Sequence, residues 1–392
     1  MQYDYLIVGA GIIGMTIAYE LVQQNQDIKI AIIDKEEDVV KHASGRNSGV
    51  LHAGFYYSAD SLKAKFTVDG NKLMKHFCKE NNIFVNETKK IVVAKDDKEV
   101  EGIYELQKRA EANGVDTSII DEDEVYKIDP NIKTYKKALY SPTTASVDPI
   151  EVCLKLKDVL KSQGVEFYFN TNFKESKLDY DYLINASGLY ADKIAKQFGL
   201  AKDYTMLPFK GIYLKYQENK TDIKTNIYPV PNLANPFLGV HYTITVDGSI
   251  KIGPTAIPAF WRENYKGLDN FNLSEMLEIL YYEAKLFLLN SFNFRNLALG
   301  EIKNYNKNIF IQKAKNLVKK IGTNFKPIPA GIRAQLLNTK TNELIQDFVV
   351  EHAKDSTHIL NAVSPAFTCS FAFAKHVVNE INQNKKGKID VK

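Results

Sequence analysis

A glycine-rich turn near the N-terminus most constrains what this chain can fold into. Residues 5–8, Tyr-Leu-Ile-Val, are a short apolar run, and residues 28–33 are a second one. Between them the spacing Gly-x-Gly-x-x-Gly opens an amphipathic helical pattern. A strand, this turn, a helix and a second strand ending on an acid are typical of a dinucleotide-binding βαβ unit. The residues of this fingerprint are Gly9, Gly11, Ile12, Ile13, Gly14, Asp34 and Lys35.

Each residue type in the fingerprint has a physical reason. Gly9 allows the tight turn, Gly11 lets the backbone approach a pyrophosphate, and Gly14 lets the helix pack closely on the strand. The helix N-terminus offers free N–H groups to the phosphates. Asp34 is placed to accept hydrogen bonds from an adenosine ribose. The fingerprint alone does not separate FAD from NAD, and a purely structural βαβ corner is the alternative.

Length and composition narrow the class of protein. A chain of 392 residues exceeds the usual single-core size, so we expect two domains. A hydrophobic content of 45% with 25% charged residues is ordinary for a globular enzyme. The net charge of +4 is small and the lysines are dispersed, which gives little support to nucleic-acid binding. Cys78, Cys153 and Cys369 show no metal-ligand spacing, and this favours a reducing compartment.

The chain shows no targeting or membrane-spanning segment. The first strand pattern begins almost at Met1, and no apolar run reaches the length of about 18 residues that a span needs. We therefore expect a cytoplasmic protein. Residues 313–321 alternate lysines with apolar residues, which is compatible with peripheral contact at the inner face of the membrane, but a solvated helix face is the favoured interpretation.

The remaining patterns suggest that the chain leaves the N-terminal domain and later returns to it. Residues 182–188 form a second strand that ends in small residues before a helix, and residues 205–255 contain several strand-like runs. The turn at 246–250 predicts a hairpin, and Asn272 with Glu275 predicts a capping box. Other helices are expected at 60–80, 98–113, 150–163 and 366–381, and other strands at 89–94, 165–170, 344–350 and 357–361.

Several stretches occur in an order that resembles a known family. These are the N-terminal βαβ unit and residues 45–57, 184–188, 228–241, 331–335 and 361–366. Together they are similar to the L-2-hydroxyglutarate dehydrogenase (oxidase) family within the D-amino-acid-oxidase-like FAD flavoproteins. The similarity covers nearly the whole chain. Residues 45–57 and 228–241 are its specific part, because many enzymes share the FAD fingerprint.

The resemblance implies a mixed α/β fold with two interleaved domains. A discontinuous Rossmann-like FAD-binding domain with a parallel sheet would comprise 1–85, 145–205 and 325–392. A mostly antiparallel substrate-binding domain, 86–144 and 206–324, would cover the flavin. The cofactor expected is FAD, and no metal is expected.

The expected FAD contacts extend beyond the fingerprint. Residues 44–49 supply backbone N–H groups and short polar side chains, and the start of the last helix can place positive potential near the flavin. A plain surface turn is the alternative for 44–49. The further contacts expected are Ser44, Arg46, Asn47, Ser48, Gly49, Phe173, Ser187, Gly188, Gly331, Arg333, Ser364, Pro365 and Ala366.

Oxidation of a 2-hydroxy acid needs a base for the hydroxyl proton and cations for the carboxylates. Of seven histidines only His52 and His241 lie in the family-specific stretches, so His52 is the first candidate base and His241 is expected to bind substrate or share that role. A structural histidine is the alternative for each. The expected substrate-binding residues are Arg333, Arg262, Lys210 and Tyr57.

Four positions depart from the family pattern. The family usually has His at Arg46, Arg at Lys210, an acid at Ile212 and Lys at Trp261. These changes alter the expected charge near the substrate.

The resemblance implies oxidation of L-2-hydroxyglutarate to 2-oxoglutarate, with hydride transfer to FAD and electrons passed to a quinone or oxygen. The alternatives are an amino-acid or amine oxidase, a glycerol-3-phosphate dehydrogenase of the same fold, and a non-catalytic FAD electron-transfer subunit.

Overall fold

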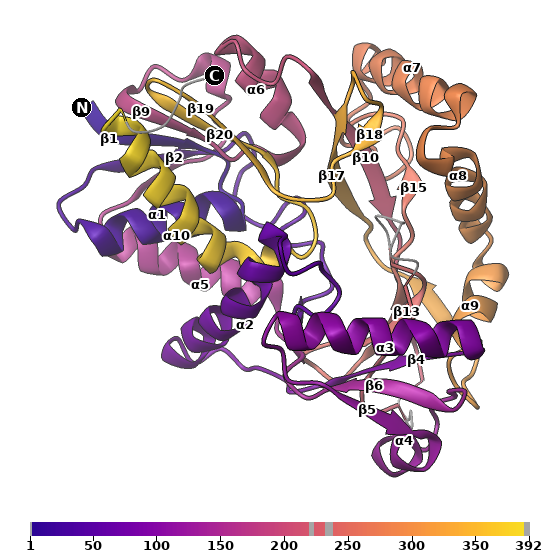
Figure 1. Cartoon of the computed structure of the whole chain (residues 1–392). Coiled ribbons are helices and arrows are strands. Elements are labelled where there is room, and N and C mark those ends of the chain that lie inside the picture. The colour runs from indigo at the N-terminus through magenta and orange to yellow at the C-terminus, as the bar shows by residue number, and fades with distance from the viewer. Residues whose placement is uncertain (1, 219–222, 232–237, 388–392) are drawn as a thin grey trace.

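The computed structural model describes residues 2–218, 223–231 and 238–387 of the chain. Within them, one parallel sheet with its helices lies beside a group of mostly antiparallel strands (Figure 1). This arrangement confirms the expected mixed α/β fold.

The parallel sheet contains the N-terminal fingerprint. Its strand order is β19-β20-β9-β1-β2-β8, and only the β19–β20 pair is antiparallel. The central strands are nearly continuous apolar runs, as expected for strands buried on both faces. The strands are β1 (Gln2–Val8), β2 (Ile30–Ile33), β8 (Glu166–Tyr168), β9 (Asp179–Asn185), β19 (Val349–Ala353) and β20 (Ser356–Asn361).

Helices cover this sheet, and their buried side chains pack against its strands in one hydrophobic core. Figure 1 shows α1, α10 and α5 lying against one side of the strands. The last helix is apolar on most sides, because α1 and α2 both pack on it. These elements are α1 (Ile12–Gln24), α2 (Leu62–Glu80), α5 (Pro149–Ser162), η1 (Phe173–Glu175), η2 (Gly188–Tyr190), α6 (Ala191–Gln197) and α10 (Ala366–Lys385).

An eight-stranded sheet forms the second part of the molecule. Its order is β16-β11-β14-β13-β12-β4-β6-β5, and β12 and β4 are its parallel pair. The predicted hairpin turn joins β13 to β14. The strands are β4 (Lys90–Val93), β5 (Ser118–Asp121), β6 (Lys137–Ser141), β11 (Leu214–Tyr216), β12 (Asn226–Pro229), β13 (His241–Ile244), β14 (Ile250–Gly253) and β16 (Phe325–Pro327).

The described residues also form a four-stranded sheet and a two-stranded sheet. The order of the former is β15-β10-β17-β18, and β3 pairs with β7. These strands are β3 (Val50–Leu51), β7 (Ala145–Ser146), β10 (Tyr204–Gly211), β15 (Ile257–Pro258), β17 (Gly331–Asn338) and β18 (Glu343–Leu344). The remaining helices are α3 (Asp97–Ala112), α4 (Glu122–Ile128), α7 (Leu273–Leu289), η3 (Ser291–Asn293), α8 (Phe294–Ile302), η4 (Lys303–Tyr305) and α9 (Lys307–Lys315).

Strands β16, β17 and β18, which fall in the expected FAD-binding segment 325–392, belong to the mostly antiparallel sheets. The domain limits stay a prediction.

The capping box expected before α7 is only half formed. The Asn272 side chain accepts the Glu275 N–H, but a Glu275 carboxylate oxygen accepts the N–H of Arg262 instead of turning back to Asn272.

The lysine-rich segment at 313–321 does not present an apolar face to solvent. Helix α9 ends at Lys315, and Leu317 and Val318 are buried in the core of the eight-stranded sheet. Among the described residues, no helix combines the length and apolar character required to cross a bilayer. The alternation of lysines and apolar residues is therefore the solvated surface of a core element.

A fully buried ion pair ties the loop before α7 to α6. Arg262 Nη1 and Nη2 donate to the two carboxylate oxygens of Asp192 at 2.6 and 2.9 Å, and Nη1 also donates to the Leu189 carbonyl. Both side chains are 0% exposed. Removal of one member would leave an uncompensated buried charge.

Arg262→Ala is therefore expected to lower the free energy of unfolding by about 3–5 kcal/mol. Urea denaturation measures it. Lys340→Ala, which breaks the exposed pair with Asp203, is the control and should change stability by less than about 1 kcal/mol. Unchanged stability of Arg262→Ala would contradict this role.

Candidate active site

A cavity of about 1090 Å³ lies at the carboxyl ends of the central parallel strands. The end of β1, the start of α1, the loop 38–48, η2, one end of β17 and the start of α10 all line it. Ligands of open α/β sheets bind at this edge. The cavity is large enough for a dinucleotide, at the upper end of the sizes usual for ligand sites.

The fingerprint glycines are required by close backbone contacts. Gly9 has a φ of +108°, and a Cβ there would lie 2.5 Å from the Ala186 carbonyl oxygen. A Cβ on Gly14 would lie 2.1 Å from the Gly9 carbonyl oxygen. A side chain at either position would separate β1 from α1 or from the turn after β9. Gly11 faces the cavity, where a Cβ would meet only the Ser44 hydroxyl, at 3.2 Å.

Two side chains hold the turn in shape. One Asp34 carboxylate oxygen accepts the N–H of Ala10 at 2.8 Å, and the other accepts the N–H of Glu36 at 3.0 Å. Ser44 Oγ accepts the N–H of Ile12 at 2.9 Å, which joins the following loop to the first turn of α1. Asp34 keeps further lone pairs toward the cavity, so it can still bind a ribose hydroxyl.

Most of the expected cofactor residues line this cavity. The two exceptions are Gly14 and Gly49, which act through packing: a Cβ on Gly49 would lie 2.2 Å from the Val147 carbonyl oxygen. The expected residues that line it are Gly9, Gly11, Ile12, Ile13, Asp34, Lys35, Ser44, Arg46, Asn47, Ser48, Phe173, Ser187, Gly188, Gly331, Arg333, Ser364, Pro365 and Ala366.

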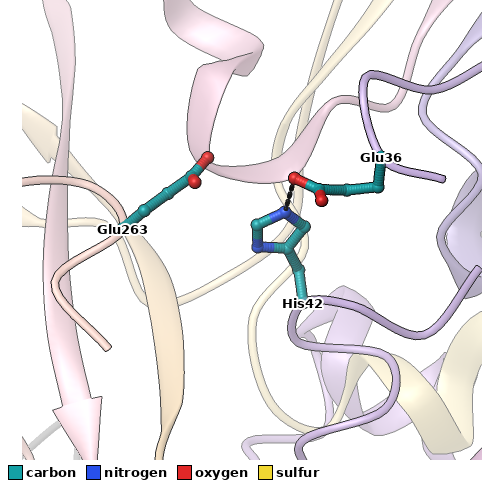
Figure 2. A group of neighbouring side chains, drawn as sticks. All are labelled: Glu36, His42 and Glu263. Carbon is teal, nitrogen blue, oxygen red and sulfur yellow. Dashed lines mark hydrogen bonds and ion pairs between the residues drawn. The ribbon is translucent and has the colours of Figure 1, made fainter. Parts of the chain in front are cut away.

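A polar cluster beside this cavity joins the loop 36–42 to the residues after β15. Ligand atoms of Glu36, His42 and Glu263 lie within 4.8 Å of one another (Figure 2). His42 Nε2 lies 2.9 Å from Glu36, and its Nδ1 lies 2.8 Å from the Tyr265 hydroxyl. Lys35 pairs with both carboxylates, at 2.7 Å from Glu263. The cluster is therefore held together by the lysine between its two carboxylates and by the hydrogen bonds of His42.

A second cavity, of about 570 Å³, adjoins the first. His52 and Arg333 line both, so they lie where a cofactor and a substrate would meet. These two residues are far apart in the sequence, and β17 carries Arg333 to the cavities that His52 also lines.

His52 is buried in the loop between β3 and α2. Its N–H donates to Thr368 Oγ1 at 3.2 Å, and its carbonyl accepts from Asn71 Nδ2 at 3.1 Å. Burial, followed by the nearby charges of Lys90 and His241, lowers the pKa of His52 well below its ordinary value. The imidazole is therefore neutral near pH 7, the form that can accept a proton.

His241 begins β13 and lines the second cavity. Its Nδ1 donates to the Gly239 carbonyl at 2.7 Å, and its ring stacks on Tyr228 with centroids 3.7 Å apart. Burial lowers the pKa of His241 to about 3, against the raising effect of the Gly239 bond. The bond to Gly239 leaves its Nε2 as the acceptor.

The expected substrate-binding residues separate into two groups. Arg333 and Tyr57 line the second cavity, whereas Arg262 and Lys210 line neither. Arg262 is held by Asp192, and Lys210 Nζ donates to Asn264 Oδ1 at 3.1 Å. These two cations therefore have structural partners in place of a substrate carboxylate.

Lys63 lines the second cavity and was not singled out from the sequence. Burial lowers its pKa to about 8, and the carboxylate of Asp347 opposes this shift. Asp347 itself accepts the N–H groups of Leu62 and Lys63 at 2.8 and 3.1 Å and so caps α2. In the sequence Lys63 resembles any exposed lysine of a first helical turn, and no spacing marks it.

All four departures from the family pattern lie away from the second cavity. Trp261 is 4% exposed and donates its indole N–H to the Asp269 carbonyl. Arg46 lines the first cavity, with its guanidinium 4.2 Å from the Tyr265 ring centroid. Ile212 donates its N–H to Thr255 Oγ1. Together with Lys210, these residues leave the lining of the second cavity unaltered.

Asp34→Ala is expected to weaken FAD binding by at least about tenfold, because it removes a ribose acceptor and leaves the N–H groups of Ala10 and Glu36 without theirs. Fluorescence titration of the apoprotein with FAD measures the affinity. Asp27→Ala, in the exposed turn before β2, is the control. Equal affinity of the two variants would contradict the assignment.

Comparisons with known proteins agree with this geometry. The model of a family described as "DAO: FAD dependent oxidoreductase" matches residues 4–380. The chain is 35% identical to L-2-hydroxyglutarate dehydrogenase of Escherichia coli (strain K12), over 97% of this chain and 93% of that protein. It is 31% identical to the mitochondrial L-2-hydroxyglutarate dehydrogenase of Homo sapiens, over 97% and 89%.

Solved structures share the fold at low sequence identity. L-alpha-glycerophosphate oxidase from Mycoplasma pneumoniae with FAD bound has a TM-score of 0.77 at 21% identity, covering 97% of this chain and 95% of that one. L-amino acid deaminase from Proteus vulgaris has a TM-score of 0.70 at 16% identity, covering 100% and 95%. The glycine turn, the cavity beside it and these similarities agree, and the chain belongs to the DAO family of FAD-dependent oxidoreductases.

Proposed function

We propose that this enzyme oxidises the C2 hydroxyl of an L-2-hydroxy acid, most simply L-2-hydroxyglutarate to 2-oxoglutarate. The observation that carries the proposal is the position of His52 and Arg333, which line both the cofactor cavity and the cavity beside it. The similarity to L-2-hydroxyglutarate dehydrogenases over 97% of the chain supports the substrate.

The histidines provide the base. In this proposal His52 takes the proton from the C2 hydroxyl, and His241 Nε2 orients the same oxygen. Both imidazoles are neutral near pH 7 because burial disfavours their charged forms. A neutral imidazole can accept a proton during the reaction without competition from solvent protons.

In this proposal, two cations of the second cavity bind the carboxylates of the substrate. Arg333 and Lys63 line the cavity, together with the acids Asp60 and Asp347. Asp347 already accepts the N–H groups of Leu62 and Lys63 at the start of α2. In this proposal Arg333 binds the carboxylate next to C2 and Lys63 the distal one. The guanidinium of Arg109 is committed to the Tyr56 carbonyl and Glu105.

FAD, when bound, supplies the acceptor of the hydride from C2. The start of α10, with Ser364, Pro365 and Ala366, lines the cofactor cavity, and its helix dipole adds positive potential there. The neutral histidines keep a lone pair free for the hydroxyl proton, and this potential stabilises negative charge beside it.

The electron acceptor is proposed to be a quinone or oxygen. Peripheral contact with a membrane stays a prediction, and exposed apolar side chains of α7 and α8 are the surface on which to test it. They include Leu273, Leu277, Tyr281, Leu288, Leu289, Leu299 and Ile302.

Anaerobic addition of L-2-hydroxyglutarate is expected to bleach the visible absorbance of the bound flavin. D-2-hydroxyglutarate is the matched control, and glycine, L-proline and glycerol 3-phosphate test the alternatives within the same fold. Bleaching by an amino acid or by glycerol 3-phosphate, with none by L-2-hydroxyglutarate, would contradict the substrate. Absence of bleaching by every compound would favour an electron-transfer subunit.

His52→Gln is expected to bind FAD and to reduce it about 10²–10⁴ times more slowly, because it lacks the base. Stopped-flow absorbance measures the rate. His358→Gln is the buried control, since His358 contacts Asn185 and Ser356 and lines neither cavity. A His52→Gln rate near that of the wild type would remove His52 as the base.

A further inference from the structure

A buried lysine lies directly behind His52. Lys90, the first residue of β4, is 0% exposed, and its Nζ lies 3.4 Å from His52 Nδ1. Within the described ranges, no carboxylate forms an ion pair with it. Lysines are rarely buried to this extent without a paired charge. The reaction proposed above does not yet use this side chain.

Aromatic rings surround the amino group. Nζ lies 4.1 Å from the ring centroid of Tyr228, 5.2 Å from that of Tyr56 and 5.7 Å from that of Phe55. The neighbours of Lys90 across the sheet are the uncharged Ser141 on β6 and Asn226 on β12.

The titratable groups that face this position come from the loop before α2, from β12 and from β13. They are His52, His241, Tyr56 and Tyr228. Burial raises the pKa of both tyrosines, so their phenols stay protonated. Since both imidazoles are also neutral near pH 7, these four groups place no charge beside Lys90.

Burial also decides where an added proton is held. It lowers the pKa of Lys90 to about 7, so a large share of the amine is neutral near neutral pH. It lowers the pKa of His52 well below its ordinary value. An added proton is consequently more stable on Lys90 than on His52, and the aromatic faces stabilise the ammonium once it forms.

We propose that Lys90 is a positioning residue and proton acceptor for His52: its neutral amine accepts a hydrogen bond from Nδ1–H, which leaves the Nε2 lone pair for the substrate hydroxyl. This inference rests on the proposed role of His52 as base. When the hydroxyl O–H bond breaks, its proton goes to Nε2 and the Nδ1 proton passes to the amine, which becomes ammonium. The C2 hydrogen leaves with its electron pair as hydride, for which FAD, when bound, would be the acceptor.

The opposite protonation state explains why the lysine must be neutral. An ammonium at Lys90 donates to Nδ1, and the single proton of the neutral imidazole then lies on Nε2. His52 can only donate a hydrogen bond to the substrate in that state. As pH rises through the pKa of Lys90, near 7, Nδ1 changes from acceptor to donor and the rate of flavin reduction should rise.

Nitrogen NMR of the FAD-loaded enzyme labelled with ¹⁵N-histidine tests the hydrogen-bond direction without any substrate. His52→Gln assigns the signals of His52. We expect the proton on Nδ1 above the transition and on Nε2 below it. A proton that stays on Nε2 throughout the pH range would overturn the proposal, and this result is independent of which compound the enzyme oxidises.

Two variants separate proton acceptance from charge and bulk. Lys90→Met keeps the bulk and Lys90→Arg keeps a permanent positive charge, but neither side chain can accept the Nδ1 proton. Both are expected to reduce flavin at least about tenfold more slowly and to lose the pH step of the wild type. A wild-type rate and pH profile in Lys90→Arg would overturn the proposal, because charge alone would then suffice.

Stability provides the second readout. Lys90→Met removes a buried polar group that has no charged partner, so its thermal unfolding midpoint should equal or exceed that of the wild type. Lys251→Met, a half-buried lysine of β14 in the same sheet, is the matched control and should keep both the rate and the pH step. The same kinetic loss in Lys251→Met would show a general effect of the sheet and contradict the assignment.

Discussion

Backbone segments approach each other closely around the first turn, and the rest of the structure depends on that contact. The Gly9 carbonyl would lie 2.1 Å from a Cβ on Gly14, and Gly9 itself lies against Ala186 of the next strand–turn unit. Because no side chain separates β1 from α1 and β9, the carboxyl ends of the strands meet at one edge. The cofactor cavity, and with it the position of the loop that carries His52, follows from this packing.

The second cavity depends on burial of charge. Burial lowers the pKa values of His52, His241, Lys63 and Lys90. Both imidazoles and part of the Lys90 amine are therefore neutral near pH 7, whereas Lys63, with a pKa of about 8, stays mostly charged. Desolvation of this kind costs stability and is common where protons are moved. The exposed pairs elsewhere on the chain have no comparable effect, since solvent screens them.

Short-range patterns made the fold and the cofactor cavity predictable. The fingerprint, Asp34 and the loop 44–49 are read from spacing, and their geometry follows locally. The burial of a side chain by residues distant in the sequence was not predictable. The expectation that the Arg262 cation binds a carboxylate agrees with the structure, but that carboxylate is Asp192, 70 residues away in the chain, instead of a substrate. Lys90 looked like an ordinary strand residue, since its burial depends on which aromatic rings reach it from other strands.

Strand β17 carries Arg333 opposite Phe209 of β10, in an unbroken antiparallel ladder from Gly331 to Asn338. A shift by one residue would turn Arg333 to the other face of the sheet. The position of Arg333 therefore depends on the pairing of all eight residues of β17. The position of Lys63, in contrast, depends on the start of α2, which a local change in sequence can alter. Variation among enzymes built on this scaffold should accordingly change the distal end of the substrate more readily than the carboxylate next to the reacting carbon.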